Sequence, residues 1–408
     1  MNISDYAPIS PLIEVEIVMA ASLVFFPVAN GDMTLMTLDN GQTILIDIKI
    51  RAAADDEDDD TYDVASDLKD RLKTDNDGRP YVDSFLLSHP DQDHITGLEN
   101  HFYLGPPADY PKDSGLIFIR EMWSSPLVFR RASTQHVLCA DAKAWAKEAR
   151  RRVQRFKDDK FDTIDGDRIL IMGKDKDGKT DEIMDIVVEQ GELLTAANRC
   201  SSGQFTGRLL APMLVAEDDE LVALLEKNNS SVIINFSLTG GGNADKCRFL
   251  TGGDAGVAIW ERLWQNHKDS DPDWFTYHIM QAPHHCSWRT LSYDRWSEMG
   301  EKVKVCEDAR SALGQGKFGA TIVASCKPIL KDDSDPPHER AKREYVSILK
   351  PDAVKGEFIC TSEYTNANDR ALEFNITFSG VSKKLRAAAA AAATVGVSAV
   401  ASSARGHG

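Results

Sequence analysis

The sequence predicts an α/β protein, and three segments carry that prediction. Residues 82–88 form a short apolar run that is typical of a buried strand. Residues 138–157, which are rich in alanine and basic side chains, look helical. Residues 372–378 alternate apolar and polar side chains with a period of two, which favours a half-buried strand. Strands and helices that alternate along one chain indicate the α/β class.

The loop after the first of these strands contains four potential metal ligands within six residues. It reads His89-Pro90-Asp91-Gln92-Asp93-His94, and Gly97 closes it before a helix can begin at Leu98. Imidazole and carboxylate ligands suit zinc, manganese or iron, and the absence of cysteine argues against a closed structural zinc site. The alternative is a polar loop that is rich in His and Asp without binding an ion. A cluster this dense at a strand end favours the metal-binding interpretation.

Composition fits a soluble enzyme and disfavours loose binding to nucleic acid. The 408 residues include 27% charged and 42% hydrophobic residues, which are ordinary globular values. The net charge of −17 repels polyanions at long range. The seven cysteines are scattered without a Cys-x-x-Cys spacing, which favours a reduced, cytoplasmic setting. The apolar stretch 18–29 is short and has no basic leader, so we expect neither a signal peptide nor stable membrane association.

The chain is expected to form one domain with a long insertion and a tail. We assign residues 1–385 to the domain, 101–226 to a helical insertion within it, and 386–408 to a flexible alanine-rich tail. The expected helix at 138–157 carries the basic string Arg150-Arg151-Arg152-Val153-Gln154-Arg155. These arginines could contact phosphate, but a solvated helix face paired with nearby Asp residues explains them equally well.

The pattern Ser-His-x-Asp-x-Asp-His-x-x-Gly resembles the metal-binding signature of the metallo-β-lactamase superfamily, with Asp91 in place of the more usual second His. Upstream, residues 26–34 and 40–47 look like the opening hairpin of that fold, with Asn-Gly at its turn. Downstream, Thr251-Gly252-Gly253-Asp254 and Pro283-His284-His285-Cys286-Ser287 are similar to segments of the subgroup typified by the hydrolase domain of ComEC-type DNA-uptake channel proteins. The resemblance spans roughly residues 14–350.

The resemblance implies an αββα sandwich that holds two divalent ions, zinc or manganese. His89 and Asp91 would then hold the first ion, Asp93 and His94 the second, and Asp254 would bridge them. Either His284 or His285 would complete the second site, while the other would donate a proton or a hydrogen bond. We therefore expect the ligands and the catalytic groups in one set: His89, Asp91, Asp93, His94, Asp254 and His284 as ligands, with Asp93, Asp254 and His285 in catalysis.

Several residues are expected beside the ligands or depart from the family pattern. Asp47 and His338 are expected to lie outside the ligand set and to support it. Lys49 is expected at the substrate, in an ion pair with Asp47 or at the surface. Cys286 stands where the subgroup has glycine, and we interpret it as a small buried thiol that fills space.

The resulting functional prediction is a dimetal hydrolase, most simply a phosphodiesterase or nuclease. Its substrate would be a nucleic acid or a small phosphodiester, and the acidic net charge weakens the nucleic-acid version. One alternative is hydrolysis of a small ester or lactone. Another is a metal-stabilised interaction module that binds a partner protein through the insertion or the tail, although a scaffold has little need of an open dimetal site.

Overall fold

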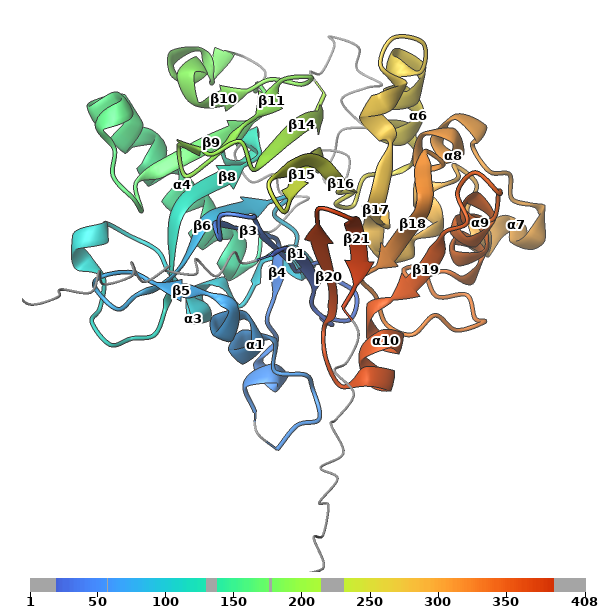
Figure 1. The fold of residues 1–408 in the computed structure, drawn as a ribbon, viewed down its shortest axis with the longest axis horizontal. Coiled ribbons are helices and arrows are strands. Elements are labelled where there is room, and N and C mark those ends of the chain that lie inside the picture. Colours follow the sequence, from blue (N-terminus) through green and yellow to red (C-terminus); the bar gives the residue numbers. More distant parts are fainter. Residues whose placement is uncertain (1–19, 57, 130–137, 176–177, 214–230, 385–408) are drawn as a thin grey trace, which may run out of the picture.

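A computed structural model describes residues 20–384, with gaps at residue 57 and at 130–137, 176–177 and 214–230 (Figure 1). Two large sheets form its framework. The first has eleven strands in the order β10-β9-β8-β6-β3-β2-β1-β20-β21, with β5 and β7 paired to β6 and β8. Its strands are β1 (Ala21–Phe25), β2 (Thr34–Thr37), β3 (Thr43–Ile46), β5 (Lys73–Thr74), β6 (Pro80–Leu87), β7 (Phe102–Tyr103), β8 (Ile117–Ser124), β9 (Arg168–Met172), β10 (Val187–Val188), β20 (Leu372–Thr377) and β21 (Gly380–Lys383).

The second sheet has seven strands in the order β11-β14-β15-β16-β17-β18-β19. Strands β16 to β19 run parallel, whereas β14, β15 and β16 form an antiparallel meander. Its members are β11 (Leu193–Leu194), β14 (Phe205–Ala211), β15 (Ile233–Gly240), β16 (Asn243–Leu250), β17 (Tyr277–Gln281), β18 (Gly316–Ala324) and β19 (Glu357–Cys360). Three short strands lie outside both sheets: β4 (Ile48–Lys49), β12 (Ala196–Ala197) and β13 (Cys200–Ser201).

One apolar core lies between the two sheets. Phe25 of β1 contacts Phe249 of β16 and Phe374 of β20, with ring centroids 5.6 and 6.1 Å apart. β20 buries every second residue, as its period-two pattern predicts. The same core takes Ile234 of β15 and Ile279 of β17. Burial of one face of each sheet therefore determines how the two sheets pack against each other.

Helices pack on the outer faces of both sheets, so the predicted α/β class is confirmed (Figure 1). On the first sheet, Trp145 of the long helix packs against Phe85 of β6, with ring centroids 4.9 Å apart. On the second sheet, Trp260, Leu313 and Tyr345 belong to one buried apolar cluster. The helices are α1 (Val64–Arg71), α2 (Gln92–Ile95), α3 (Leu98–His101), α4 (Ala140–Asp159), α6 (Val257–His267), α7 (Trp296–Met299), α8 (Glu307–Leu313), α9 (Glu339–Leu349) and α10 (Thr361–Asn368).

The opening hairpin has the geometry that its sequence predicts. β2 pairs with β3 in antiparallel register, and Gly41 at the turn has a φ of 76°. A backbone position with a positive φ favours glycine, because glycine has no Cβ to clash with the backbone. β3 then runs parallel to β6, with Ile46 opposite Leu86, so that Asp47 lies beside the start of the metal-ligand loop.

The segment 101–226 differs from the helical insertion that the sequence suggested. It contains one long helix, α4, but it also supplies β8 and β9 to the first sheet and β14 to the second. β8 pairs with β6 along most of its length and buries seven of its eight residues, so it is part of the central framework. The expected tail at 386–408 lies outside the described residues.

The basic string on α4 is largely neutralised within the fold. Arg151 contacts Glu148 and Asp167 at 2.7 and 2.5 Å. Arg152 is buried, bonded to Glu148 and to backbone carbonyl oxygens. Arg155 pairs with Asp159 of the same helix and with Asp167, which precedes β9. Of the four arginines proposed as phosphate contacts, only Arg150 is an exposed cation without an ion pair to another described residue.

None of the helices in the described ranges combines the length and the apolarity that a membrane span requires.

Candidate metal centre

The predicted ligand loop leaves the carboxyl end of β6 and turns back on itself. Asp91 caps the short helix α2, and the backbone N–H of His94 donates to the Asp91 carbonyl oxygen at 3.1 Å. This turn brings the buried rings of His89 and His94 to a centroid distance of 4.0 Å. Gly97 closes the turn with a φ of 94°, and a Cβ there would lie 2.7 Å from the Ile50 carbonyl oxygen. Glycine is therefore required at this position.

Asp254 reaches the same place from the second sheet through two glycines. A Cβ on Gly252 would lie 2.6 Å from a ring carbon of Pro283, and one on Gly253 would lie 2.7 Å from the Ser231 Cβ. The close approach lets the Ser231 hydroxyl accept a hydrogen bond from the Asp254 N–H at 3.0 Å. The Thr-Gly-Gly-Asp segment thus folds tightly enough to bury Asp254 at the strand end.

The paired histidines lie in a strained turn after β17. His284, His285 and Cys286 have φ angles of 50°, 52° and 67°, in the left-handed region that non-glycine residues seldom adopt. Two backbone hydrogen bonds hold the turn, from His284 N–H to the Gly253 oxygen at 2.8 Å and from His338 N–H to the Cys286 oxygen at 3.0 Å. Such strain is characteristic of functional sites. Cys286 is buried, and burial raises the pKa of its thiol.

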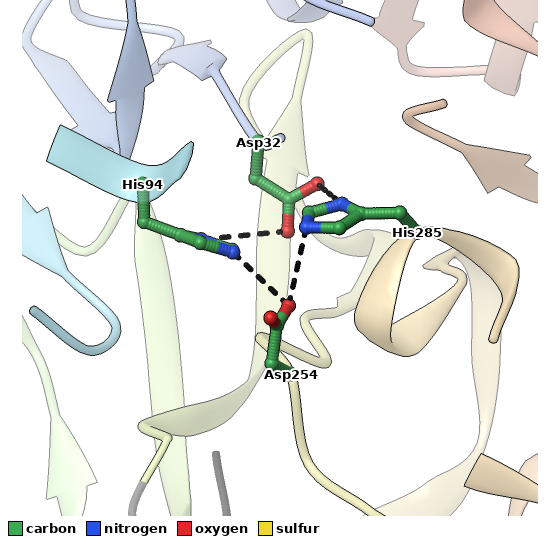
Figure 2. Close-up of side chains that lie close together, drawn as sticks. All are labelled: Asp32, His94, Asp254 and His285. Atoms are coloured by element: carbon green, nitrogen blue, oxygen red, sulfur yellow. Dashed lines mark hydrogen bonds and ion pairs between the residues drawn. The ribbon is translucent and has the colours of Figure 1, made fainter. Parts of the chain in front are cut away.

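One carboxylate, that of Asp254, faces four imidazoles. Its Oδ1 lies 3.0 Å from His94 Nε2 and 3.4 Å from His285 Nε2. Its Oδ2 lies 3.5 Å from His89 Nε2 and 3.7 Å from His284 Nε2. Figure 2 shows two of these imidazoles, those of His94 and His285, which both contact Asp254 and Asp32. The two oxygens therefore define two adjoining groups of donors.

The remaining carboxylates of the loop divide between the same two groups. Asp91 Oδ2 lies 3.9 Å from His89 Nε2, and Asp93 Oδ2 lies 3.3 Å from His285 Nε2. One group thus contains His89, Asp91 and His284, and the other contains Asp93, His94 and His285, with Asp254 between them. The sequence left open which of the paired histidines joins Asp93 and His94. The structure places His285 there and His284 with His89.

The three fully buried imidazoles of the centre each have a side-chain oxygen near Nδ1, the ring nitrogen that faces away from Asp254. His94 Nδ1 lies 2.8 Å from Asp47 Oδ2, and His89 Nδ1 lies 3.1 Å from the Ser88 hydroxyl. His285 Nδ1 lies 3.4 Å from Asp32 Oδ1. A carboxylate at Nδ1 orients the ring and leaves Nε2 for a metal. In all three imidazoles Nε2 is the atom that faces Asp254.

Asp47 is itself fixed by the start of the loop. It accepts hydrogen bonds from the Ser88 N–H at 2.7 Å and the Ser88 hydroxyl at 2.6 Å. These bonds and the contact with His94 use both carboxylate oxygens, and they hold Asp47 at a φ of 53°. The structure thus places Asp47 where the resemblance implied, beside the ligand set. Lys49 does not pair with it and instead donates to the Asn30 carbonyl oxygen.

Asp32 is the site residue that the sequence analysis missed. It forms with His94, Asp254 and His285 a buried set whose donor atoms all lie within 4.8 Å of one another. Because His94 Nδ1 already contacts Asp47, we assign Asp32 to the orientation of His285. Its signal in the sequence is weak: a Gly-Asp pair just before β2.

His338 lies outside the donor groups but supports the strained turn. It caps α9, with its Nδ1 accepting from the Arg340 N–H at 3.1 Å, and its ring packs 4.8 Å from Trp296. Its contribution to the centre is the backbone hydrogen bond to Cys286 described above.

Burial and charge act in opposite directions on the two innermost imidazoles. Burial would lower the pKa of His94, but the carboxylates of Asp254 and Asp47 hold it well above its ordinary value. Burial would also lower the pKa of His285, yet Asp254 and Asp32 raise it to about 10. Although burial opposes it, the imidazoles hold the pKa of Asp254 well below its usual range. Without a cation both imidazoles are thus protonated, and a divalent ion would replace those protons.

The donor groups meet the chemical requirements of a cation. His89 Nε2 and His285 Nε2 are buried and make no hydrogen bond within the described residues. Buried polar atoms rarely remain unsatisfied, and a cation is the partner that several convergent imidazoles and carboxylates would share. The set of Asp32, His94, Asp254 and His285, whose donor atoms lie within 4.8 Å of one another, could hold a metal ion.

A scan against protein-family models found no match to the chain, and a search of curated proteins found none either. The likeness to the metallo-β-lactamase superfamily therefore rests on the sequence motifs alone.

Proposed function

We propose that the chain is a dimetal hydrolase of the metallo-β-lactamase superfamily, with the αββα arrangement of that fold. The observation that carries this proposal is the position of Asp254, which presents each carboxylate oxygen to a separate pair of imidazoles. A carboxylate so placed is suited to bridging two ions. Zinc and manganese match the mixed nitrogen and oxygen donors.

Two less buried residues of the centre, Asp93 and His284, supply the remaining chemistry. Two divalent ions would lower the pKa of a shared water toward neutrality and polarise the group under attack. Asp93 is ionised, because the imidazoles His285 and His94 outweigh burial and lower its pKa. Its carboxylate can orient a water by accepting a hydrogen bond from it. Burial lowers the pKa of His284, so its neutral ring can hydrogen-bond a substrate oxygen.

A small phosphodiester is the substrate that we favour. The carboxylate Asp91 in place of an imidazole gives the centre harder oxygen ligands, and the resembling subgroup is associated with DNA degradation. Against a polymer stand the net charge of −17 and the internal pairing of the arginines on α4. A small ester or lactone remains the second candidate because the same centre would activate water for either.

The first test combines metal analysis with a hydrolysis screen. Protein purified without chelator should contain up to two divalent ions per chain and cleave bis(p-nitrophenyl) phosphate. The screen should include single-stranded DNA, dinucleotides and lactones, with EDTA-treated protein as the control. Folded, freshly prepared protein without metal would contradict the proposal, and cleavage of lactones alone would change its substrate class.

A further inference from the structure

A cavity of about 360 Å³ adjoins the candidate metal centre. Asp254 and His284 form one of its walls, and the first residues of α6 form another. The opposite rim carries Arg289, Tyr293 and Arg295. The volume falls in the range of roughly 300–1,000 Å³ that small-molecule sites occupy.

The cations of this rim are available to a ligand. Arg289 is exposed, and its guanidinium makes no hydrogen bond or ion pair with the part of the chain that the structure describes. Arg295 has one ion pair, 3.2 Å from Glu298, in which both side chains are more than 60% exposed, at 63% and 62%. Exposed pairs of this kind contribute at most about 1 kcal/mol and exchange readily. This contrasts with Arg151 and Arg152 of α4, which are held by acidic side chains and backbone oxygens.

Two acidic residues, Asp254 and Asp294, also line the cavity. Asp294 accepts a hydrogen bond from the Lys304 N–H at 2.8 Å, and Asp254 is committed to the four imidazoles. The amino-terminal end of α6, which begins at Val257, adds the positive end of an eleven-residue helix. In a strongly acidic protein, the open side of the centre thus borders a cavity with two guanidinium groups.

We propose that this cavity binds a second anionic group, a terminal phosphate, of a small phosphodiester whose scissile bond lies at Asp254 and His284. The inference rests on the proposed function and narrows its substrate class. Guanidinium groups bind phosphate through paired charge-assisted hydrogen bonds. Tyr293, whose hydroxyl donates to Glu261, also lines the cavity. A substrate held by its terminal phosphate is oriented before reaction, which lowers KM without requiring contacts along a polymer.

The kinetic test compares two substrates with the same scissile bond. These are the thymidine dinucleotide dTpdT with a terminal phosphate, at the 5′ or the 3′ end, and dTpdT without one. Wild-type protein should show a KM roughly tenfold lower for one phosphorylated form, which corresponds to one charged contact. Arg289→Gln should abolish that difference in KM. Arg150→Gln, an exposed arginine on α4, is the matched control and should preserve it.

Equal KM values for the three dinucleotides in wild-type protein would overturn the inference, as would a difference that survives Arg289→Gln. A binding experiment keeps the inference testable if no dinucleotide is cleaved, an outcome that counts against the proposed function alone. In EDTA-treated protein, inorganic phosphate should bind more weakly to Arg289→Gln than to wild type, as measured by NMR titration. Equal binding by wild type, Arg289→Gln and Arg150→Gln would refute the phosphate pocket whatever the activity.

Discussion

The two sides of the candidate metal centre differ in burial. The inner side consists of His89, His94 and His285, whose side chains are 0% exposed. The outer side consists of Asp91, Asp93 and His284, which are 22%, 36% and 18% exposed. The inner rings have oxygens beside Nδ1 and direct Nε2 toward Asp254, so they can fix the position of an ion.

This difference indicates a division of labour between the two sides. The inner side can bind ions tightly because its donors are already oriented and shielded from water. The outer side is where water and substrate can enter, and the neighbouring cavity opens beside it. Substitutions on the inner side should therefore act on metal affinity, whereas substitutions at surface positions that contact neither side should leave the chemistry nearly unchanged.

The largest effect is expected for Asp254→Asn, because Asp254 contacts both donor groups. The amide keeps the size of the side chain but removes the charge that the two donor groups share. Metal content should fall, and hydrolysis should drop by more than the roughly 10- to 100-fold loss typical of residues that only support ligands. Elemental analysis and initial rates test this. Asp269→Asn, at an exposed surface position, is the control, and full metal content in Asp254→Asn would rule out the shared role.

The next effect concerns Asp47, which supports the inner side without belonging to a donor group. Asp47→Asn should weaken metal binding by roughly 10- to 100-fold, because the ring of His94 loses its carboxylate partner. Added zinc or manganese should restore most of the rate, which distinguishes an orienting role from a structural one. A competition titration with a chelator measures the affinity. Affinity equal to that of wild type would argue that the inner side does not depend on such partners.

A pH-dependent effect is expected in metal-free protein. The folded-state pKa of His285 is about 10, above the ordinary value of 6.5. The protonated ring thus stabilises the fold fully below pH 6.5, and this contribution is lost as the pH rises to about 10. The difference in Tm between wild type and His285→Gln, both in EDTA, should therefore shrink over that interval. A difference that grows with pH would show that the inner imidazole is neutral.

The smallest effect is expected outside both sides, for Arg150 on α4. Arg150→Gln should change hydrolysis of single-stranded DNA or a small phosphodiester by no more than roughly twofold, as for other surface substitutions. The rate should be measured across a salt titration. A marked loss with DNA alone would indicate a polymer path over α4 and would weaken the case for a small substrate.

Local patterns in the sequence predicted much of the framework. The Asn-Gly turn, the strand before the ligand loop, the helix at 138–157 and the alternating strand at 372–378 are all confirmed, because each depends on neighbouring residues. The role of 101–226 was not accessible in the same way. Its strands β8 and β14 join two different sheets through long-range pairing, which their own residues do not specify.

The site shows the same limit. The ligand loop could be found because its donors are adjacent in the sequence. The assignment of His284 and His285 to different donor groups could not be predicted, because it depends on three successive residues with left-handed backbone conformations. A glycine at the third position would have indicated such a turn, but the residue there is a cysteine. Asp32 was overlooked because only the fold brings it to His285. In the sequence Arg151 and Arg152 belong to an apparent positive patch, yet only the folded structure shows that acidic residues pair with them.

The origin of the donors on both sheets has a consequence for how the protein matures. His94 and Asp254 are 160 residues apart in the chain, and the paired histidines follow later still. A nascent chain that has emerged only as far as the ligand loop offers His89, Asp91, Asp93 and His94 but lacks the carboxylate between the two groups. Contacts of such long range form late in folding. Metal uptake should therefore be one of the last events after synthesis, and bound metal would hold the two sheets together at the centre.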